Sequence, residues 1–295
     1  MKVYEGLTFA EVYHKALYDV YYKPEYECSP RGQSIKEITN AAFVIEDPIK
    51  CLYTNPKRSS QFNYIAAELL WYFAGRNDVG FIKKYAKFWE QIANEKGELN
   101  SAYGNLILRR RNTHGISQWQ WAYDCLKKDK DSRQSILHFN TPEHQYFDNK
   151  DFVCTLSGIF QIRDNKLNFT VEMRSNDIIL GTATDISFFC LLQQQMLKLL
   201  KEDCYSDLEL GTYTHIIHSL HVYERHFQLV EEMLKVPIFE AVSFPEIDNN
   251  FIKLDGSMTP EFEMIHDAVS DNEFIETNDE MFNWIVEKTI NKCKV

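Results

Sequence analysis

The sequence predicts a mixed α/β fold, because segments with helical periodicity stand on either side of a segment with strand periodicity. Apolar side chains recur at helical spacing in residues 9–22 and 63–73, and residues 186–200 are apolar on almost every side. Between residues 151 and 174, apolar and polar positions alternate instead. No Pro-, Gly- or Ser-rich linker, repeat or low-complexity tract divides the chain before about residue 236, so we expect one main domain.

Two of the helical segments are expected to bury large surfaces. Residues 63–73 carry a broad apolar face, formed by Ala66, Ala67, Leu69, Leu70 and Phe73. Residues 186–200 read ISFFCLLQQQMLKLL and offer few positions that suit solvent. Because a helix that is apolar all round is enclosed by the rest of its domain, we predict that this segment is a central buried helix.

A β-hairpin is predicted around the turn sequence RDNK at residues 163–166. Apolar residues occupy alternating positions on both sides of this turn: Leu156, Phe160 and Ile162 before it, and Leu167, Phe169, Val171 and Met173 after it. Such a period of two is typical of strands with one buried face.

The stretch after Val236 differs from the rest of the chain. It is acidic and holds Pro, Gly and Asp or Asn clusters before a closing amphipathic segment, residues 281–290. We therefore divide the chain into a main domain, residues 1–235, and a C-terminal extension, residues 236–295, that packs on the same domain. The sequence assigns no role to this extension.

The charge of the chain restricts its partners. The 32 Lys and Arg side chains face 43 Asp and Glu, giving a net charge of −11, whereas broad nucleic-acid binding needs a basic face. No apolar run approaches the ~18–20 residues that span a bilayer, and the first six residues lack the apolar core of a signal peptide. We expect a cytoplasmic protein that binds neither membranes nor nucleic acid, and that meets any small anion with local cations.

The cysteines and histidines predict no metal site. Seven cysteines are scattered without any Cys-x-x-Cys pair, which argues against disulfide frameworks and zinc ribbons. Four histidines between residues 215 and 226 are spaced by three, three and five positions, which fits no standard site. Most of the thiols are expected to be small buried apolar groups, and only Cys154 is distinguished by its surroundings.

A set of short motifs occurs in a fixed order around Cys154. ELLW at residues 68–71 and DSRQ at 131–134 precede it, and MRSND at 173–177, LGTATD at 180–185 and SLHVY at 219–223 follow it. Their order and spacing resemble the thymidylate synthase superfamily over roughly residues 20–235, which would make residues 1–235 the catalytic domain. The resemblance implies a large twisted mixed sheet packed against helices, with two subunits associating sheet to sheet. It also implies folate-dependent one-carbon transfer to carbon 5 of a pyrimidine nucleotide.

The resemblance assigns the chemistry to three side chains. Cys154 matches the nucleophile that adds to carbon 6 of the pyrimidine, which makes carbon 5 enolate-like. Arg174 is expected to favour its thiolate. Glu68 matches the glutamate that organises water and proton transfer, a task suited to a partly buried carboxyl group with a raised pKa. Tyr103 matches a residue that assists proton removal at carbon 5.

Further residues match the positions that bind the nucleotide. Arg31, Arg133 and Arg174 correspond to the arginines that grip the phosphate, because a guanidinium group makes bidentate hydrogen bonds to phosphate oxygens. The residue equivalent to Arg133 reaches across the dimer interface into the partner's site. The family has a second consecutive arginine where this chain has Gln134. The phosphate site therefore has one positive charge fewer, or another residue supplies that charge.

The remaining matches concern the sugar and the folate. Ser175 would add a phosphate contact, and His221 with Tyr223 would hold the sugar 3′-hydroxyl. Trp89, Asp177 and Arg58 correspond to contacts with methylenetetrahydrofolate, with Asp177 accepting hydrogen bonds from the pterin. The resemblance implies no metal.

Asp185 departs from the pattern of ordinary thymidylate synthases, which carry asparagine at this position. The asparagine amide pairs with the donor at N3 and the acceptor at O4 of uracil, whereas cytosine presents an acceptor at N3 and an amino donor at carbon 4. A protonated aspartate, or a proton shared with N3, satisfies both groups of cytosine. Two mismatched polar pairs can discriminate by ~10⁴-fold, so this residue is expected to select the base.

Aspartate at position 185, with the MRSND and SLHVY motifs and GELNS at residues 97–101, resembles the phage deoxycytidylate hydroxymethylase branch of the family. In that branch, water traps the one-carbon unit at carbon 5. We therefore predict conversion of dCMP to 5-hydroxymethyl-dCMP by a homodimer. Four alternatives stay open: methylation of dUMP, methylation of dCMP, hydroxymethylation of CMP or dUMP, and a relative without turnover that binds nucleotide or messenger RNA.

Overall fold

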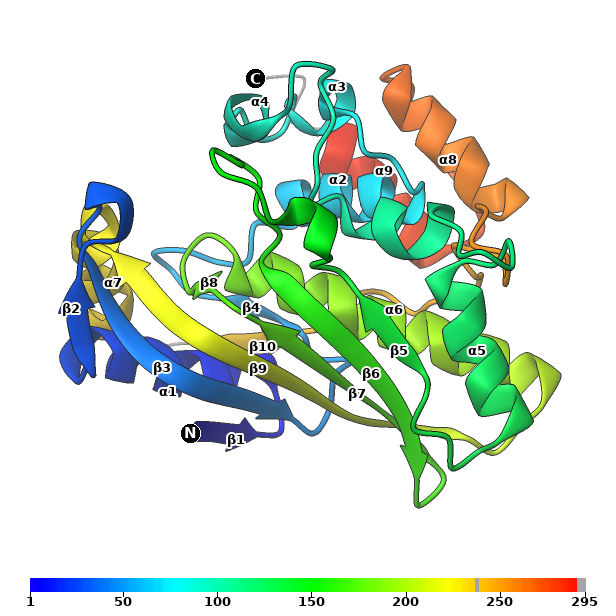
Figure 1. The fold of residues 1–295 in the computed structure, drawn as a ribbon, viewed down its shortest axis with the longest axis horizontal. Helices are drawn as coiled ribbons and strands as arrows, with labels where there is room; N and C mark the ends of the chain where they lie inside the picture. Colours follow the sequence, from blue (N-terminus) through cyan, green and yellow to red (C-terminus); the bar gives the residue numbers. More distant parts are fainter. Residues whose placement is uncertain (237–238, 291–295) are drawn as a thin grey trace.

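The computed structural model describes residues 1–236 and 239–290, and one mixed sheet of eight strands dominates this part of the chain (Figure 1). Its strands are β1 (Lys2–Gly6), β2 (Tyr26–Cys28), β3 (Ile35–Ile45), β5 (Ile136–His138), β6 (Thr155–Arg163), β7 (Lys166–Met173), β8 (Asn176–Asp177) and β9 (Glu209–Tyr223). The order is β1-β3-β9-β7-β6-β5, with β2 beside β3 and β8 beside β9. β1 runs parallel to β3, and β7 and β8 run parallel to β9, while the other pairs are antiparallel. The predicted α/β class is confirmed.

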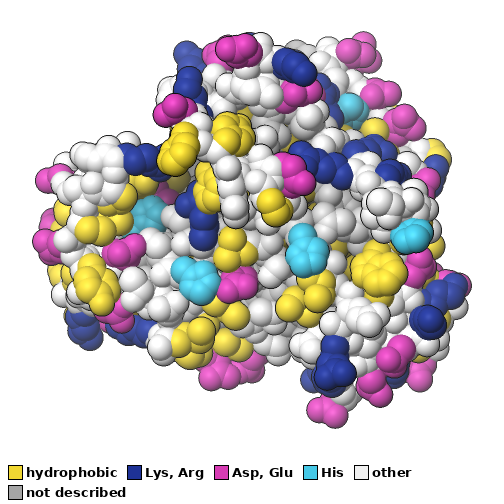
Figure 2. All heavy atoms as spheres, in the orientation of Figure 1, with side chains coloured by type: hydrophobic (Ala, Val, Ile, Leu, Met, Phe, Trp, Pro, Cys, Tyr) yellow, Lys and Arg dark blue, Asp and Glu magenta, His cyan; other side chains and the backbone are white. Residues whose placement is uncertain are grey.

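The helices are gathered behind and above the sheet in Figure 1. They are α1 (Phe9–Tyr22), α2 (Phe62–Phe73), α3 (Val79–Ile82), α4 (Phe88–Ile92), α5 (Gln118–Lys128), α6 (Thr182–Asp203), α7 (Phe227–Lys235), α8 (Pro260–Ser270) and α9 (Glu280–Ile290). None of the described helices is long and apolar enough to cross a membrane. The face turned to the viewer is formed by β3, β9, β7 and β6, and Figure 2 shows apolar, charged and histidine side chains mixed on it.

The predicted hairpin is confirmed as β6 and β7. Its two turn residues, Asp164 and Asn165, have φ values of 49° and 58°, as the tight turns that match strand twist require. The Phe160 and Phe169 rings stack across the strands with centroids 3.9 Å apart. A register shift between Thr155 and Ser157 marks the start of β6, directly after Cys154. This hairpin therefore presents Cys154 at one end of the sheet.

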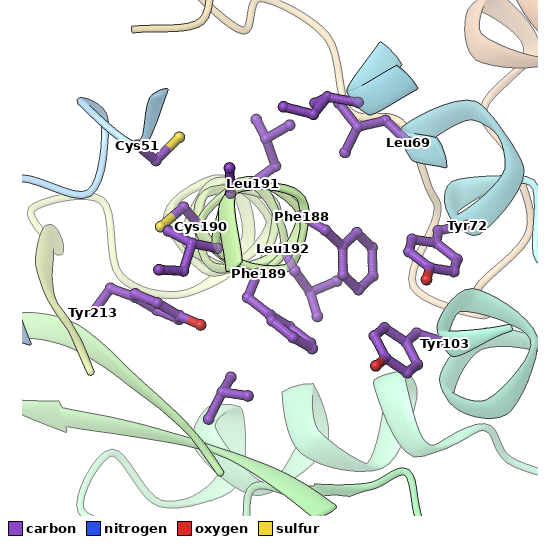
Figure 3. Packing of buried hydrophobic residues seen from close by; sticks show 14 of the residues in the cluster. Cys51, Leu69, Tyr72, Tyr103, Phe188, Phe189, Cys190, Leu191, Leu192 and Tyr213 are labelled. Carbon is purple, nitrogen blue, oxygen red and sulfur yellow. The ribbon is translucent and has the colours of Figure 1, made fainter. Parts of the chain in front are cut away.

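Helix α6 is the central buried helix that the sequence predicts. Figure 3 looks along it and shows side chains from α2, from the sheet and from the segment of Tyr103 surrounding it. The ring of Phe188 lies 4.7 Å from that of Tyr72, and Phe189 lies 5.7 Å from Tyr103. The helix begins four residues earlier than its apolar pattern, because its first turn is polar and carries Asp185. An acidic residue is favoured there by the helix dipole.

The chain after residue 239 returns to the main domain at both ends. Strand β10 (Glu240–Val242) pairs with β4 (Leu52–Thr54), and α9 packs beside α2. Between them, Phe251 and Phe262 pack against Phe73 of α2, with the Phe73 and Phe251 rings 4.9 Å apart. Phe282 of α9 packs on Phe251 and Phe262 in turn. The predicted boundary at residue 235 stays a prediction, and residues 237–238 and 291–295 of the extension lie outside the described residues.

Candidate active site

Cys154 and Arg174 face each other at the open end of the hairpin. Arg174 follows β7 and donates its backbone N–H to the Cys154 carbonyl oxygen at 2.9 Å. Its Nη2 lies 3.4 Å from Cys154 Sγ, and its Nε donates to the Val153 carbonyl oxygen at 3.1 Å. Nη2 also donates to the Phe152 carbonyl oxygen. The guanidinium group thus fixes the loop that carries the thiol.

The predicted effect of Arg174 on the Cys154 thiolate agrees with the structure, but the net pKa of the thiol is raised. Arg174 and Arg31 both act to lower the pKa of the thiol, but burial raises it by more, and the negative charges of Asp185 and Asp151 add to that increase. The thiol therefore stays protonated at neutral pH before substrate binds. Attack on a pyrimidine then requires removal of this proton.

Glu68 lies in the middle of α2 and is only 5% exposed. Burial and the negative charge of Asp185 raise its pKa to about 8, while hydrogen bonds from Tyr64 and Tyr72 act against that rise. Tyr64 donates to Glu68 Oε1 at 2.7 Å, and Trp89 Nε1 donates to the Tyr64 hydroxyl oxygen at 2.8 Å. The predicted raised pKa of Glu68 agrees with its surroundings. Our sequence reasoning missed Tyr64, although its position one helical turn before Glu68 was a usable signal.

Tyr103 is buried between aromatic rings, stacked on Tyr72 with centroids 5.2 Å apart. Burial and the charge of Asp185 raise its pKa well above the ordinary value, so it remains a phenol near neutral pH. It is suited to donate a hydrogen bond rather than to act as a phenolate base. The next residue, Gly104, touches the backbone of α2: a Cβ there would lie 1.6 Å from the Tyr72 carbonyl oxygen.

Asp185 is held in the first turn of α6 and is partly buried. Asn176 Nδ2 donates to its Oδ2 at 2.7 Å. Burial raises the pKa of Asp185 to about 7, and the bond from Asn176 acts against that rise. The carboxyl group therefore exchanges its proton near neutral pH. Asn176 and Thr182, which contacts it, were not anticipated from the sequence.

Asp177 offers a buried carboxylate oxygen to a ligand. Its Oδ1 accepts the backbone N–H groups of Ile179 and Leu180 at 2.8 and 3.2 Å, but Oδ2 is buried without a partner among the described residues. Arg58 Nη2 donates to the Ile179 carbonyl oxygen at 3.1 Å and so holds the same loop. Because a buried acceptor without a donor is costly, this oxygen fits a ligand N–H group such as those of a pterin.

The predicted sugar and phosphate residues lie around the same end of the sheet. His221 of β9 pairs with Asp177 of β8, and the Tyr223 ring meets the His221 ring edge-on at 5.1 Å. Ser175 directly follows Arg174 in the chain. Arg31 is exposed in a loop with a φ of 54°, and its charge acts on Cys154.

Arg133 differs from the other predicted site residues. It is exposed between α5 and β5 and makes no hydrogen bond or ion pair with any other described residue. The structure therefore does not bring it into the cluster within one chain. Among the residues described, no group of three or more His, Cys, Asp or Glu is arranged to hold a metal ion.

A sequence model of the thymidylate synthase family matches residues 13–266. The chain belongs to this family. The match extends beyond residue 235 into α8, so the family's region includes part of the C-terminal segment. Thermostable thymidylate synthase A from Bacillus subtilis has the same fold, with a TM-score of 0.64 at 20% sequence identity over 85% of this chain and 92% of that one.

Members of the thymidylate synthase family from phages are more similar in sequence. Deoxycytidylate 5-hydroxymethyltransferase of Enterobacteria phage T4 is 33% identical over 213 residues, covering 69% of this chain and 82% of that protein. Deoxyuridylate hydroxymethyltransferase of Bacillus phage SP01 is 30% identical over 220 residues, covering 70% of this chain but 56% of that protein. These relationships indicate a one-carbon transferase that uses methylenetetrahydrofolate as co-substrate.

Proposed function

We propose that this chain is a deoxycytidylate 5-hydroxymethyltransferase that converts dCMP to 5-hydroxymethyl-dCMP. The observation that carries the proposal is the Asp185 carboxyl group, whose pKa burial raises to about 7 within the cluster that includes Cys154. The phage deoxycytidylate relatives support the same substrate. A proton on this carboxyl group can be given to N3 of cytosine, and the other oxygen can accept from the 4-amino group.

The same proton assists the first bond-making step. When the Cys154 thiol gives its proton to solvent water and the sulfur bonds to carbon 6, electron density moves from the 5,6 double bond towards N3. A proton from Asp185 at N3 neutralises that charge. Carbon 5 then becomes the nucleophile that takes the one-carbon unit, which bound methylenetetrahydrofolate supplies. Asp177 and Arg58 are proposed to hold the folate, with Trp89 lining the same side.

Glu68 is proposed to handle the water that gives the hydroxymethyl product. Its pKa of about 8 lets it accept and return a proton near neutral pH, and the Tyr64 hydroxyl group holds one of its oxygens. The Tyr72 hydroxyl group bonds the same carboxyl group, and a water molecule near the pyrimidine is proposed to share it. Tyr103, which remains a phenol near neutral pH, is proposed to donate a hydrogen bond on the carbon-5 side of the nucleotide.

The nucleotide is proposed to bind with its phosphate at Arg31, Arg174 and Ser175 and its sugar at His221 and Tyr223. The uncovered sheet face provides a surface for a second subunit: its half-buried side chains include Ile159, Thr170, Thr214 and Ile216. In the homodimer, Arg133 would complete the partner's phosphate site. The cytoplasmic location stays a prediction.

A second candidate is hydroxymethylation of dUMP. The Bacillus phage SP01 relative supports it, since its name specifies deoxyuridylate and its identity to this chain is nearly as high. The two functions predict different substrates for the same site, and the base preference of the purified chain distinguishes them.

The test is to incubate the purified chain with methylenetetrahydrofolate and dCMP, dUMP or CMP, and to follow product mass and dihydrofolate absorbance. We expect a hydroxymethyl product from dCMP without dihydrofolate. Dihydrofolate formed with dUMP would instead identify a methylating synthase, and a hydroxymethyl product from dUMP alone would support the second candidate. Tight binding of a nucleotide without turnover of any would support a non-catalytic relative.

Asp185→Asn tests the residue that carries the proposal. The amide suits N3–H and O4 of uracil, so the ratio of kcat/KM for dCMP to that for dUMP is expected to fall by about 10³-fold or more. Thr184→Val, one residue earlier on α6, serves as the control for disturbance of the helix start. An unchanged ratio in Asp185→Asn would exclude Asp185 as the residue that selects the base.

A further inference from the structure

We propose that Asn176 and Thr182 are positioning residues that fix which oxygen of Asp185 carries the proton, and that this choice selects cytosine over uracil. The inference rests on the proposed function and deepens it. A protonated carboxyl group alone does not discriminate between the two bases. It can donate to N3 and accept from the amino group of cytosine, or accept from N3–H and donate to O4 of uracil, once its two oxygens exchange roles.

The three side chains form a buried chain of hydrogen bonds. Asn176 is 3% exposed in β8, and Thr182 at the start of α6 is fully buried. The Thr182 hydroxyl group donates to Asn176 Oδ1, and Asn176 Nδ2 donates to Asp185 Oδ2 at 2.7 Å. Gly181 leaves room for this contact, because a Cβ there would lie 3.2 Å from Asp185 Oδ2 and 3.4 Å from Asn176 Nδ2.

The surroundings favour this orientation of the Asn176 amide over the rotated one. In the observed orientation the second hydrogen of Nδ2 points to Met173 Sδ at 3.4 Å, and Oδ1 receives the Thr182 hydroxyl. Rotation by 180° would set the amide oxygen against the sulfur of Met173, which carries no hydrogen, and such a contact is unfavourable for a buried polar atom.

The orientation of the amide decides where the proton of Asp185 resides. Because Oδ2 already receives an N–H group from Asn176, a proton on Oδ2 would face that hydrogen directly. The proton is therefore placed on Oδ1, which makes no hydrogen bond with any described residue and is free to meet the base. In the proposed pose N3 of the base lies at Oδ1, because no described residue bonds this oxygen, so cytosine finds a donor at N3 and an acceptor for its amino group at Oδ2. Uracil would need the proton on Oδ2, where Asn176 opposes it.

Other titratable groups act on Asp185 from the elements packed around it, and they stay unchanged in the variants below. The groups whose charges interact with it are Tyr64, Glu68 and Tyr72 on α2, Tyr213 on β9, and two further residues, Tyr103 and Cys154. A change in base preference after substitution of Asn176 or Thr182 is thus attributable to the hydrogen-bond chain.

The experiment compares Asn176→Ala and Thr182→Val with Thr184→Val, a matched loss of a buried hydroxyl group. Thr184 donates to the Gly181 carbonyl oxygen at 2.8 Å and makes no hydrogen bond to Asn176. We expect the dCMP/dUMP ratio of kcat/KM to fall by about tenfold in both test variants, as loss of one buried hydrogen bond implies, and to stay within about twofold in the control. Thr182→Val keeps the side-chain shape, so the test survives if Asn176→Ala does not fold.

The pH profile separates positioning from general disturbance. Asn176 stabilises the ionised carboxyl group of Asp185, so Asn176→Ala should raise the pKa of Asp185. The decline of dCMP turnover at high pH should then begin at a higher pH in Asn176→Ala but not in Thr184→Val. Equilibrium binding of dCMP and dUMP without folate gives the same ratio independently of turnover. A wild type that does not hydroxymethylate dCMP would refute the proposed function alone. A binding ratio unchanged in folded Asn176→Ala and Thr182→Val would refute the positioning role, whichever nucleotide the wild type prefers.

Discussion

At the scale of single residues, the site is defined by two carboxyl groups that burial keeps from ionising easily. Glu68 and Asp185 reach pKa values of about 8 and about 7, and the charge of Asp185 contributes to the first of these. Because the two groups interact, their titration in solution belongs to the pair rather than to either residue alone. Proton-transfer groups with such values are suited to work on both sides of neutral pH.

Tyr64→Phe tests the hydroxyl group that holds Glu68. The variant loses a hydrogen bond that favours the ionised carboxylate, so the pKa of Glu68 should rise and kcat should fall by about 10-fold or more. The measurement is kcat against pH, in which the limb assigned to Glu68 moves to higher pH. Tyr18→Phe, on an exposed part of α1, is the control and should leave the profile in place. Equal profiles for Tyr64→Phe and the wild type would show that Tyr64 does not act through Glu68.

Much of this residue-scale account follows from resemblance, and some of it does not. Cys154, Glu68 and Asp185 stand in motifs whose order along the chain is distinctive. The net pKa change of Cys154 was not predictable, because it depends on how deeply the folded chain buries the thiol relative to Arg174 and Arg31. The contact of Tyr64 with Trp89 joins residues 25 positions apart on two helices, which no local pattern specifies.

At the scale of elements, helix α2 carries a site residue and also packs against the C-terminal segment. One part of it carries Glu68, and its far end carries Phe73, which packs against Phe251 and Phe262 of the C-terminal segment. Phe62 at its start meets Trp284 of α9 with ring centroids 6.3 Å apart. The position of Glu68 therefore depends on packing from a part of the chain that follows the site residues by more than twenty positions.

Phe282→Ala tests this packing. Phe282 is buried in α9 and contacts Phe251 and Phe262, so its truncation should reduce the free energy of unfolding by about 3–5 kcal/mol. Urea denaturation measures the effect. Phe274→Ala is the control, because Phe274 lies in the same segment but is 65% exposed, and it should change stability by less than about 0.5 kcal/mol. Equal losses in both variants would contradict the packing role of α9.

The elements themselves were largely predictable. Periodicity located the hairpin and the segments that form α1, α2, α6 and α9, since each has one face or all faces buried. It missed the first turn of α6, because Thr182 and Asp185 are polar and serve the site, while Thr184 is polar and donates to the Gly181 carbonyl oxygen. The role of the extension was not readable, because its partners on α2 and α6 come from distant parts of the sequence.

At the scale of the whole molecule, proton uptake by the buried carboxyl groups couples the site to stability. The folded chain holds a proton on Glu68 up to a pH of about 8, whereas an ordinary glutamate loses it near 4.5. The native state therefore binds more protons than the unfolded state in this window, and its stability falls as pH rises through it.

Glu68→Gln removes this dependence. As pH rises from about 5 to about 8.5, the free energy of unfolding of the variant should increase relative to that of the wild type, on the order of a few kcal/mol. Urea denaturation at the two pH values measures the gain, and Glu263→Gln on the exposed side of α8 provides the comparison. A constant difference between Glu68→Gln and the wild type across this window would mean that Glu68 ionises normally.

Subunit mixing tests the proposed dimer. Homodimers of Cys154→Ser would lack the proposed nucleophile, and those of Arg133→Ala would lack the proposed shared phosphate contact. A mixed dimer would contain one site with both residues intact. Random mixing should therefore restore roughly a quarter of wild-type activity, because half of the dimers are mixed and each has one good site. Activity that remains the average of the two parents after mixing would mean that Arg133 serves its own subunit.

The C-terminal segment returns to the main domain at both ends, through β10 on β4 and α9 on α2. A chain that ends at residue 235 would consequently not be a functional shorter enzyme. It would expose the apolar side of the helix that holds Glu68, and contiguous exposed apolar surface promotes aggregation. Proteolytic cleavage in the final quarter of the chain is accordingly expected to reduce solubility and turnover together. The protein should therefore not be shortened by removing this segment.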